Sequence, residues 1–250
     1  MGTVKRNSEY NNAAGEDKTL TQKVYEKIKE MMFAYEIIPG QRLIFIDLAK
    51  RLGVSRTPVN NALSILSNEG FLDFVPNHGY RVHQITQSEA ESLYEIREII
   101  ELGSIGKAIE KLTPEKLGTL ERRKKLYEKA VADQVSRGRF ILDQEFHAGQ
   151  VLLSDNPYLA DYFREVYQRI FLRHRIEGLL AERTQDVVVE HNEIFEAIKY
   201  RDVERAKESI KAHIKAGKAY IFSVIFEENT ADGPTTGGES PKHRLFLSEE

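Results

Sequence analysis

Four side chains of the kinds that bind metal ions interrupt the apolar stripes of predicted helices. Asp143 and His147 are spaced i, i+4 within one stripe, so both side chains leave the same face of a helix. His191 and His213 each interrupt the apolar stripe of a further helical segment. An unpaired buried carboxylate is strongly destabilising. An inward Asp beside three inward imidazoles therefore requires a compensating partner.

A divalent metal ion would supply that partner. An i, i+4 pair directs two donors from one helix, and histidines of two other helices can complete a site inside a helical bundle. Nitrogen and oxygen donors suit zinc, nickel or manganese, and we expect zinc. Taken singly, each histidine is more often a satisfied core or surface residue than a ligand, and that alternative stays open. The other histidines lie in different surroundings and are not expected to join the site: His78, His83, His174 and His243.

The four candidate ligands require a helical scaffold. From Ser88 to Glu227 the sequence shows no strand-like alternation and at least five amphipathic stretches, which predicts an all-α bundle. The stretches are separated near Thr113-Pro114, Gly138, Asn156-Pro157, Thr184 and Arg201-Asp202. The inner face of the first helix is predicted at Leu93, Ile96, Ile100 and Gly103, and that of the last at Ala206, Ile210, Gly217 and Ile221.

The segment before the bundle has a different pattern. Thr19 is placed to cap a first helix that ends before Pro39, a second short helix stops at Gly53, and Ser55 is placed to cap a third helix, which Gly70 ends. Two β-like runs, Phe71–Val75 and Tyr80–Val82, then flank a turn that contains glycine. Three helices followed by a hairpin are typical of a winged helix-turn-helix.

The third helix carries the residues predicted to contact DNA. Val59, Ala62, Leu63 and Leu66 form its apolar face, which leaves Arg56, Thr57, Asn60, Asn61 and Ser64 on or near the exposed side. Winged modules place this helix in the major groove. Three short helices and a hairpin also occur in other small α+β domains, and the pattern alone does not decide between the two.

Specific strings in this segment resemble the GntR family of bacterial transcription regulators. They are Ile38-Pro39-Gly40-Gln41-Arg42-Leu43, Leu52-Gly53-Val54-Ser55-Arg56-Thr57-Pro58-Val59, Glu69-Gly70 and Gly79. The resemblance implies that Ser55, Arg56 and Thr57 contact phosphates and base edges, and that His78 and Gly79 lie along the minor groove.

This sequence departs from the GntR pattern at two positions of the third helix. Asn60 and Asn61 stand where the family usually has Arg followed by Glu. Asparagine can form a bidentate pair with adenine, so we predict an altered operator preference, with simple solvation of Asn60 as the alternative. Arg42, Lys50 and Arg51 are expected to neutralise the DNA backbone, although each of them would also be ordinary as surface charge.

The helical part also resembles a known pattern, the FCD branch of the GntR family, and the whole resemblance spans about residues 18–226. The matching strings are Tyr94-Glu95-Ile96-Arg97-Glu98, Asp143-Gln144-Glu145-Phe146-His147, Asn156-Pro157-Tyr158-Leu159 and His191-Asn192-Glu193-Ile194-Phe195-Glu196-Ala197-Ile198, continuing through Ala206 to His213.

The FCD resemblance implies an all-helical, effector-binding domain. In metal-binding members the ligands are one Asp and three His, which correspond here to Asp143, His147, His191 and His213. The family's effectors are mostly small carboxylates, which an open metal position would accept in place of water. Arg97 is the candidate second anchor, through a bidentate carboxylate contact. A surface or interhelical ion pair is the alternative for Arg97.

Composition and charge agree with a regulator made of two parts. The 250 residues include no cysteine, which excludes disulfides, thiolate zinc sites and cysteine nucleophiles. No apolar run approaches the roughly 20 residues of a membrane-spanning helix, and the N-terminus has no signal-peptide pattern, so we expect a cytoplasmic protein. Residues 1–85 carry 11 Lys and Arg against 9 Asp and Glu, whereas residues 86–250 carry 25 against 30. A mildly basic front suits a nucleic-acid module.

The predicted fold is mainly α, an N-terminal winged helix-turn-helix followed by an all-α helical bundle effector domain. The predicted segments are a disordered arm (1–18), the DNA-binding domain (19–83), the ligand- and metal-binding domain (88–227) and a flexible tail (228–250). We expect a bacterial, ligand-responsive transcription factor and not an enzyme. It would act as a homodimer on a palindromic operator, with repression relieved by a small organic acid as the favoured behaviour.

Two alternatives remain at this point. A metal ion with an open position can activate water, so the first alternative is a metal-dependent hydrolase. Against it, no carboxylate has a clear general-base role, and residues 19–82 would be unexplained. The second alternative is a sensor whose physiological ligand is the metal ion itself.

Overall fold

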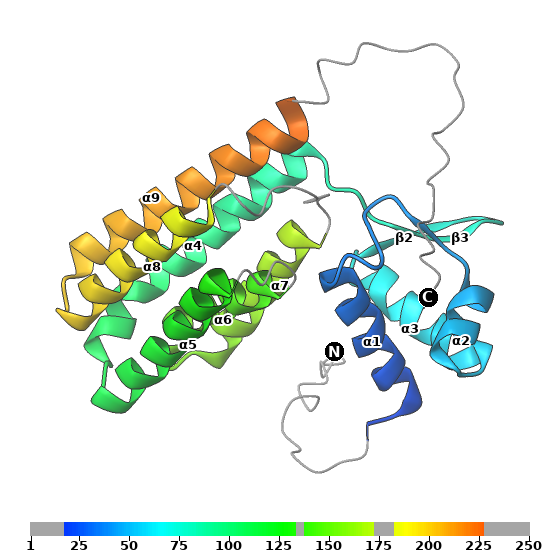
Figure 1. The fold of residues 1–250 in the computed structure, drawn as a ribbon, viewed down its shortest axis with the longest axis horizontal. Coiled ribbons are helices and arrows are strands. Elements are labelled where there is room, and N and C mark those ends of the chain that lie inside the picture. Colours follow the sequence, from blue (N-terminus) through cyan, green and yellow to red (C-terminus); the bar gives the residue numbers. More distant parts are fainter. Residues whose placement is uncertain (1–17, 134–137, 173–182, 228–250) are drawn as a thin grey trace, which may run out of the picture.

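The computed structural model describes residues 18–133, 138–172 and 183–227. Within these ranges the chain forms a small module with a three-stranded sheet and a larger helical module, side by side (Figure 1). The predicted arm, except for Lys18, and the predicted tail lie outside the described residues. No helix in the described part is long and apolar enough to cross a membrane.

The smaller module has the element order predicted from the sequence, with one addition. Its elements are α1 (Leu20–Phe33), β1 (Arg42–Leu43), α2 (Phe45–Leu52), α3 (Arg56–Asn68), β2 (Leu72–Val75) and β3 (Gly79–Val82). The strands form an antiparallel sheet in the order β1-β3-β2, in which Leu43 pairs with Tyr80 and Phe74 pairs with Tyr80 from the other side. The two-residue strand β1 was not predicted, because so short a run has no periodicity to recognise.

Local signals in the sequence explain where these helices begin and end. The Thr19 side chain accepts a hydrogen bond from the Gln22 backbone, and the Gln22 side chain accepts one from the Thr19 backbone, which completes a capping box. Gly53 ends α2 in the left-handed conformation, with φ of 67°. Ser55 precedes α3 as predicted, but its side chain makes no capping hydrogen bond.

The core of this module joins α1 to α3. The predicted apolar face of α3 is buried, and it packs with Val24 and Ile28 of α1 and with Val82 of the wing. Burying one face fixes which side of α3 is left for other contacts.

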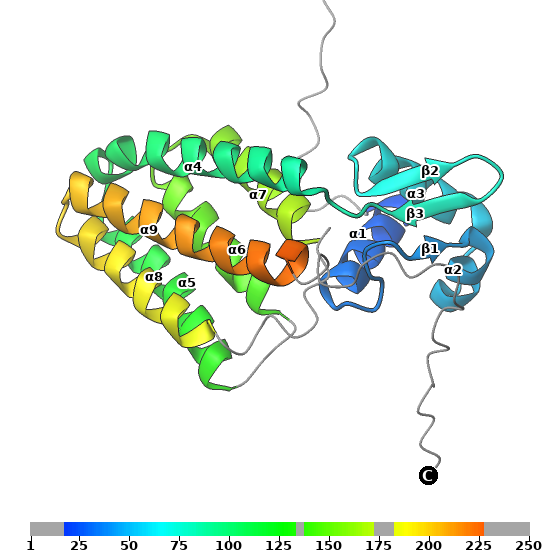
Figure 2. The ribbon, with the colours of Figure 1, turned by 90° about the horizontal axis from the view of Figure 1, so that it is seen from above.

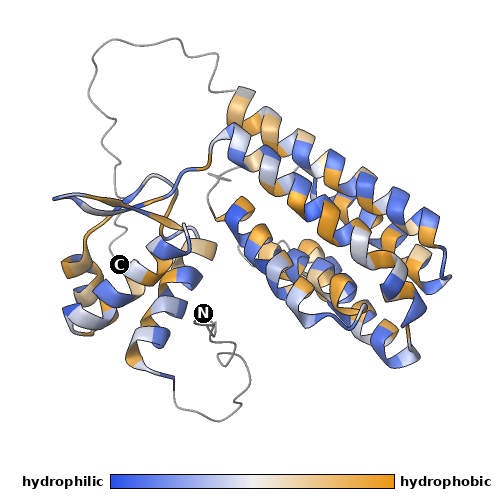
Figure 3. Ribbon diagram, turned by 180° about the vertical axis from the view of Figure 1, so that it is seen from behind, coloured by the Kyte–Doolittle hydropathy of each residue, from blue (hydrophilic) through white to orange (hydrophobic). Residues whose placement is uncertain are grey.

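The second module is an all-α bundle, which confirms the predicted fold class. Its helices are α4 (Gln87–Glu110), α5 (Pro114–Ala132), α6 (Arg139–Leu152), α7 (Pro157–Phe171), α8 (Thr184–Lys199) and α9 (Val203–Phe222), followed by a π-helical turn (Ser223–Glu227). Side chains of Thr113, Asn156 and Asp202 cap α5, α7 and α9. Hydrophobic residues lie mainly where the helices face one another (Figure 3).

The predicted inner face of α4 was wrong at two of its positions. Ile96 is 43% exposed and Gly103 is also exposed, whereas Arg97 and Glu101 are buried along with Tyr94. Helix α4 packs against α6, α7 and α9, and it turns a partly polar stripe inward because Arg97 and Glu101 pair with each other there.

The predicted inner face of α9 agrees better with the structure. Ala206, Ile210 and Ile221 are buried, as the apolar spacing predicted. His213 is buried on the same helix, so the polar interruption of this stripe does point into the bundle.

The two modules lie side by side in Figure 2, and they make contact at the linker and at the end of α7. In the linker, His83 Nδ1 lies 2.9 Å from Asp73 Oδ1 of β2, and His83 Nε2 lies 3.2 Å from Glu89 Oε1 of α4. Leu172, which follows α7, is only 4% exposed and belongs to the core of the smaller module. Tyr35 of the smaller module packs in turn against the core of the bundle.

Candidate functional site

Three of the predicted metal ligands meet inside the bundle. His147 of α6, His191 of α8 and His213 of α9 are all buried. One ring nitrogen of each lies within 4.8 Å of the others. Helices that are distant in sequence therefore bring the three imidazoles to one place.

Carboxylates orient two of these imidazoles. His147 Nδ1 lies 2.9 Å from Glu101 Oε2, and His213 Nδ1 lies 2.7 Å from Glu190 Oε2. A hydrogen bond at Nδ1 leaves Nε2 as the nitrogen that can bind a metal ion. Within the described residues, the buried His147 Nε2 and both ring nitrogens of His191 have no partner in hydrogen-bond geometry.

Asp143 adjoins the imidazole cluster. Its carboxylate oxygens lie 3.3 Å from His191 Nε2 and 3.9 Å from His147 Nε2. The Tyr167 hydroxyl of α7 donates a hydrogen bond of 2.5 Å to Asp143 Oδ2. Burial raises the pKa of Asp143, but the contact with His191 and the charge of His147 outweigh it and lower the pKa below its ordinary value. Asp143 is therefore a carboxylate at neutral pH.

The protonation states of His191 and His213 also suit metal binding. Burial lowers the pKa of His191 to about 3, against the opposing effect of Asp143, so this imidazole is neutral at pH 7. Burial likewise lowers the pKa of His213 despite its contact with Glu190. Burial raises the pKa of Glu101, but the charges of His147 and Arg97 lower it to about 2 overall.

These residues fit a divalent metal ion. Two donors on one tetrahedral zinc ion lie about 3.3 Å apart, given bonds of about 2.0–2.1 Å. Asp143 and His191 already have this spacing, and the three imidazoles need only small movements to reach it. Three nitrogen donors and one carboxylate suit zinc, nickel or manganese, and the orphaned ring nitrogens are the positions that such an ion would satisfy.

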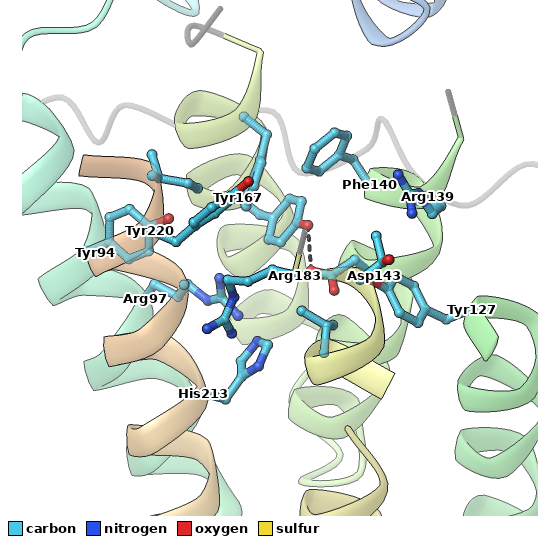
Figure 4. A pocket seen from close by; sticks show the side chains of 15 residues that line it. Tyr94, Arg97, Tyr127, Arg139, Phe140, Asp143, Tyr167, Arg183, His213 and Tyr220 are labelled. Carbon is cyan, nitrogen blue, oxygen red and sulfur yellow. Dashed lines mark hydrogen bonds between the residues drawn. The ribbon is translucent and has the colours of Figure 1, made fainter. Parts of the chain in front are cut away.

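A cavity of about 100 Å³ opens beside Asp143 and His213 (Figure 4). All six bundle helices contribute to its wall, together with Arg183 just before α8. Because a single water needs only about 10–15 Å³, the cavity has room for several waters or a small organic molecule. Three arginines line it, Arg97, Arg139 and Arg183, and Asp143 is the acidic residue among the described lining residues. Arg97 and Arg183 pair with Glu101 and Glu190, so part of this positive charge is neutralised within the protein.

Arg97, the candidate second anchor, lies in the wall of this cavity. Its Nε donates a 2.7 Å hydrogen bond to Glu101 Oε1 within α4. Its Nη2 is buried and has no hydrogen-bond partner in the described part of the chain. Arg97 thus forms an ion pair with Glu101 through Nε, while its Nη2 is available to donate a hydrogen bond to a ligand.

Sequence reasoning missed Glu101, Glu190 and Tyr167. Two of them left a signal, since Glu101 follows Arg97 at i+4 and Glu190 directly precedes His191. Tyr167 reaches Asp143 from another helix, and no spacing within α7 indicates that contact.

The predicted DNA-contacting residues of α3 lie on its exposed side. Ser55, Arg56, Thr57, Asn60 and Asn61 are all exposed, while the opposite face is buried in the module's core. The geometry therefore leaves these side chains available to a groove of DNA.

The other predicted contacts lie at the wing and at the end of α2. His78 is exposed in the turn between β2 and β3, and Arg42 donates a 2.9 Å hydrogen bond from Nε to the His78 carbonyl oxygen. Gly79 opens β3 with φ of 82°. Lys50 and Arg51 are exposed, and Arg51 also forms an ion pair with Glu36.

Comparisons with known proteins agree with this architecture. The model of the bacterial regulatory proteins, gntR family, matches residues 20–82, and the FCD domain model matches residues 92–216. HTH-type transcriptional regulator YdhC of Bacillus subtilis is 28% identical over 81% of this chain and 91% of its own. An HTH-type regulator in an unstable DNA locus of Streptomyces ambofaciens is 30% identical over 80% of this chain and 84% of its own.

Solved structures show the same fold. The structure of McbR/YncC of E. coli has a TM-score of 0.73 at 22% identity, and covers 83% of this chain and 99% of its own. A GntR regulator from Rhodococcus sp. RHA1 has a TM-score of 0.72 at 21% identity, with 81% and 97% covered.

The fold and the matched domains define a DNA-binding transcriptional regulator and not an enzyme. The chain belongs to the GntR family and combines its helix-turn-helix domain with an FCD domain. The hydrolase alternative is thereby set aside.

Proposed function

We propose that the protein is a ligand-responsive regulator whose helical domain, residues 88–227, holds a divalent metal ion, with zinc preferred. The ligands are Asp143, His147, His191 and His213. The observation that carries this proposal is the set of three buried imidazoles whose ring nitrogens converge while carboxylates hold Nδ1 of two of them. Such carboxylate–histidine pairs are typical of metal sites in proteins.

We further propose that a small carboxylate is the effector. When bound, the metal ion would supply a position that accepts a carboxylate oxygen in place of water. Arg97 would hold the ligand from the α4 side, because its Nη2 has no partner among the described residues. The arginine side chains in the cavity wall supply hydrogen-bond donors for an anion.

At the other end, residues 19–83 would bind a palindromic operator as part of a homodimer. Ser55, Arg56, Thr57, Asn60 and Asn61 would contact the major groove, since all are exposed, Ser55 just before α3 and the others on one side of it. His78 and Gly79 would follow the minor groove, and Arg42, Lys50 and Arg51 the phosphates. One recognition helix reads few base pairs, which favours paired modules. Repression relieved by the effector remains the favoured mode.

The metal assignment is tested by elemental analysis of purified protein. His191→Ala should lower both the metal content and the melting temperature, because metal binding to the folded state adds to stability. His78→Ala removes an exposed imidazole from the wing and serves as the control, with unchanged metal content. Equal occupancy in His191→Ala and the parent protein would reject the ligand assignment.

The effector assignment is tested on DNA duplexes selected from a random library. Organic acids that change the DNA affinity of the metal-loaded protein support an organic effector. DNA release that follows metal removal and ignores organic acids would instead identify a sensor of the metal ion.

A further inference from the structure

Two buried hydrogen-bond donors on α4 find no partner among the described residues and belong to side chains that line the same cavity. Tyr94 Oη and Arg97 Nη2 are both buried and both lack a hydrogen-bond partner in the described residues, and both residues line the cavity. Figure 4 shows them on the same side of it. Buried polar groups in native proteins are nearly always paired with protein, water or ligand, so these two donors are available to an acceptor that enters the cavity.

The chemistry of these donors selects the acceptor. A guanidinium nitrogen only donates, and burial raises the pKa of Tyr94 further above neutrality, so its hydroxyl keeps its proton. A carboxylate accepts from two donors at once. Tyr94 and Arg97 lie on α4, whereas the imidazole cluster and Asp143 lie on α6, α8 and α9, so a ligand in the cavity can meet the two groups from different helices.

We propose that Tyr94 and Arg97 form a subsite for a second carboxylate, so that the effector is a short dicarboxylate. One carboxylate faces the imidazole cluster and the other accepts hydrogen bonds from Tyr94 and Arg97. A cavity of about 100 Å³ limits the carbon chain between them. This inference rests on the proposed effector function and specifies its ligand class.

Chain-matched acids test the subsite by calorimetry on the metal-loaded protein. Malonate, succinate and glutarate are compared with propionate, butyrate and valerate, so that length is controlled. A site with buried donors discriminates strongly against a ligand that leaves them unpaired, and we expect the best dicarboxylate to bind at least roughly 100-fold more tightly than its matched monocarboxylate.

A single hydroxyl deletion separates this subsite from general destabilisation. Tyr94→Phe should weaken the dicarboxylate by about 10-fold and leave the monocarboxylate unchanged, so that selectivity falls. Tyr158→Phe, which removes the hydroxyl of an exposed tyrosine, should preserve selectivity. If dicarboxylates and monocarboxylates bind with equal affinity, or if Tyr94→Phe weakens both equally, the proposed subsite is wrong, although a monocarboxylate could still be the effector. Failure of every acid to bind would reject the effector proposal itself.

A different observation concerns the last turn of α7, which faces the cavity and the smaller module at once. Tyr167 and Phe171 line the cavity, and their rings stack at 4.2 Å. Gln168 accepts a 2.6 Å hydrogen bond from Lys29 Nζ of α1, and Leu172 is buried in the smaller module's core. One helical turn therefore contacts both functional regions.

We infer that this turn couples the cavity to the DNA-binding module. A ligand beside Tyr167 and Phe171 changes the packing of α7, and a helix moves as a unit, so Gln168 and Leu172 shift with it. Coupling between two sites requires a ligand to favour one arrangement over another. The inference rests on the proposed function, since it presumes that an effector changes DNA affinity.

Variants at the polar contact test this coupling without touching the cavity. Lys29→Met removes the hydrogen bond to Gln168, and Lys27→Met on the exposed side of α1 is the control. The affinity of the metal-loaded protein for succinate, or for whichever of the tested acids binds best, is measured with and without a selected DNA duplex. Coupling is reciprocal, so the duplex should change this affinity, typically by roughly 5- to 150-fold. The ratio of the two affinities, with and without DNA, should move closer to one in Lys29→Met and stay at the parental value in Lys27→Met. If this ratio is the same in Lys29→Met as in the parent protein, the coupling does not run through α7. If DNA leaves the acid affinity of the parent protein unchanged, effector control itself is rejected.

Discussion

Replacing Glu101 by Gln tests how the imidazole cluster is held ready for a metal ion. Glu101 uses one carboxylate oxygen for Arg97 Nε and the other for His147 Nδ1. Glutamine has one acceptor oxygen in place of two. If the glutamine oxygen accepts the hydrogen bond from Arg97, the glutamine NH2 group faces His147 Nδ1 and donates to it. His147 then carries its hydrogen on Nε2, and a protonated Nε2 cannot bind a metal ion. If the glutamine oxygen instead accepts the hydrogen bond from His147, the glutamine NH2 group faces Arg97 Nε, and two donors then point at each other.

The expected cost has two parts. Loss of the partner behind a metal-binding histidine typically lowers metal affinity by about 10- to 100-fold, which corresponds to about 1.4–2.7 kcal/mol. A buried donor left without an acceptor destabilises the metal-free fold by about 1–3 kcal/mol. Because Arg97 and Glu101 are both almost fully buried, solvent cannot replace the missing acceptor.

Competition with a metal chelator measures the first quantity, and urea unfolding of metal-free protein measures the second. Glu95→Gln, on the exposed side of the same helix, controls for the loss of a negative charge. Parental metal affinity in Glu101→Gln, within about twofold, would refute the argument that Glu101 sets the tautomer of His147.

Further expectations concern DNA binding and packing. Arg56→Ala should cost about 1–3 kcal/mol in affinity for a selected duplex, whereas Lys50→Ala should weaken all duplexes alike and reduce the salt slope by about 1; unchanged anisotropy titrations would contradict both roles. Gly79→Ala should destabilise the protein by about 1–2 kcal/mol, since its φ is 82°, and parental thermal stability would argue against strain there. Gly149→Ala should lower the free energy of unfolding by about 0.5–1.5 kcal/mol. Its new Cβ would lie 2.5 Å from Arg123 Nη1 and would displace the Arg123 side chain from its hydrogen bond. An unchanged free energy in urea unfolding would show that Arg123 moves without loss of stability.

Much of the fold could be read from local patterns. The period of the apolar residues predicted the face of α3, the cap Thr19 marked where α1 begins, and the pairs Thr113-Pro114 and Asn156-Pro157 marked the boundaries before α5 and α7. The inner face of α4 could not be read this way. Its buried stripe includes Arg97 and Glu101, and a rule that places apolar residues inside fails where charged residues are buried as a pair.

The sequence by itself determined the residue types of the candidate site and the helix faces on which Asp143, His147, His191 and His213 lie, because helical spacing is a local property of the chain. Only the tertiary structure decided what surrounds them. Glu190 directly precedes His191 in sequence, yet it contacts His213 of another helix, and Tyr167 reaches Asp143 across the bundle. Contacts between helices depend on how those helices pack, and that packing is set by the whole core and not by any one segment.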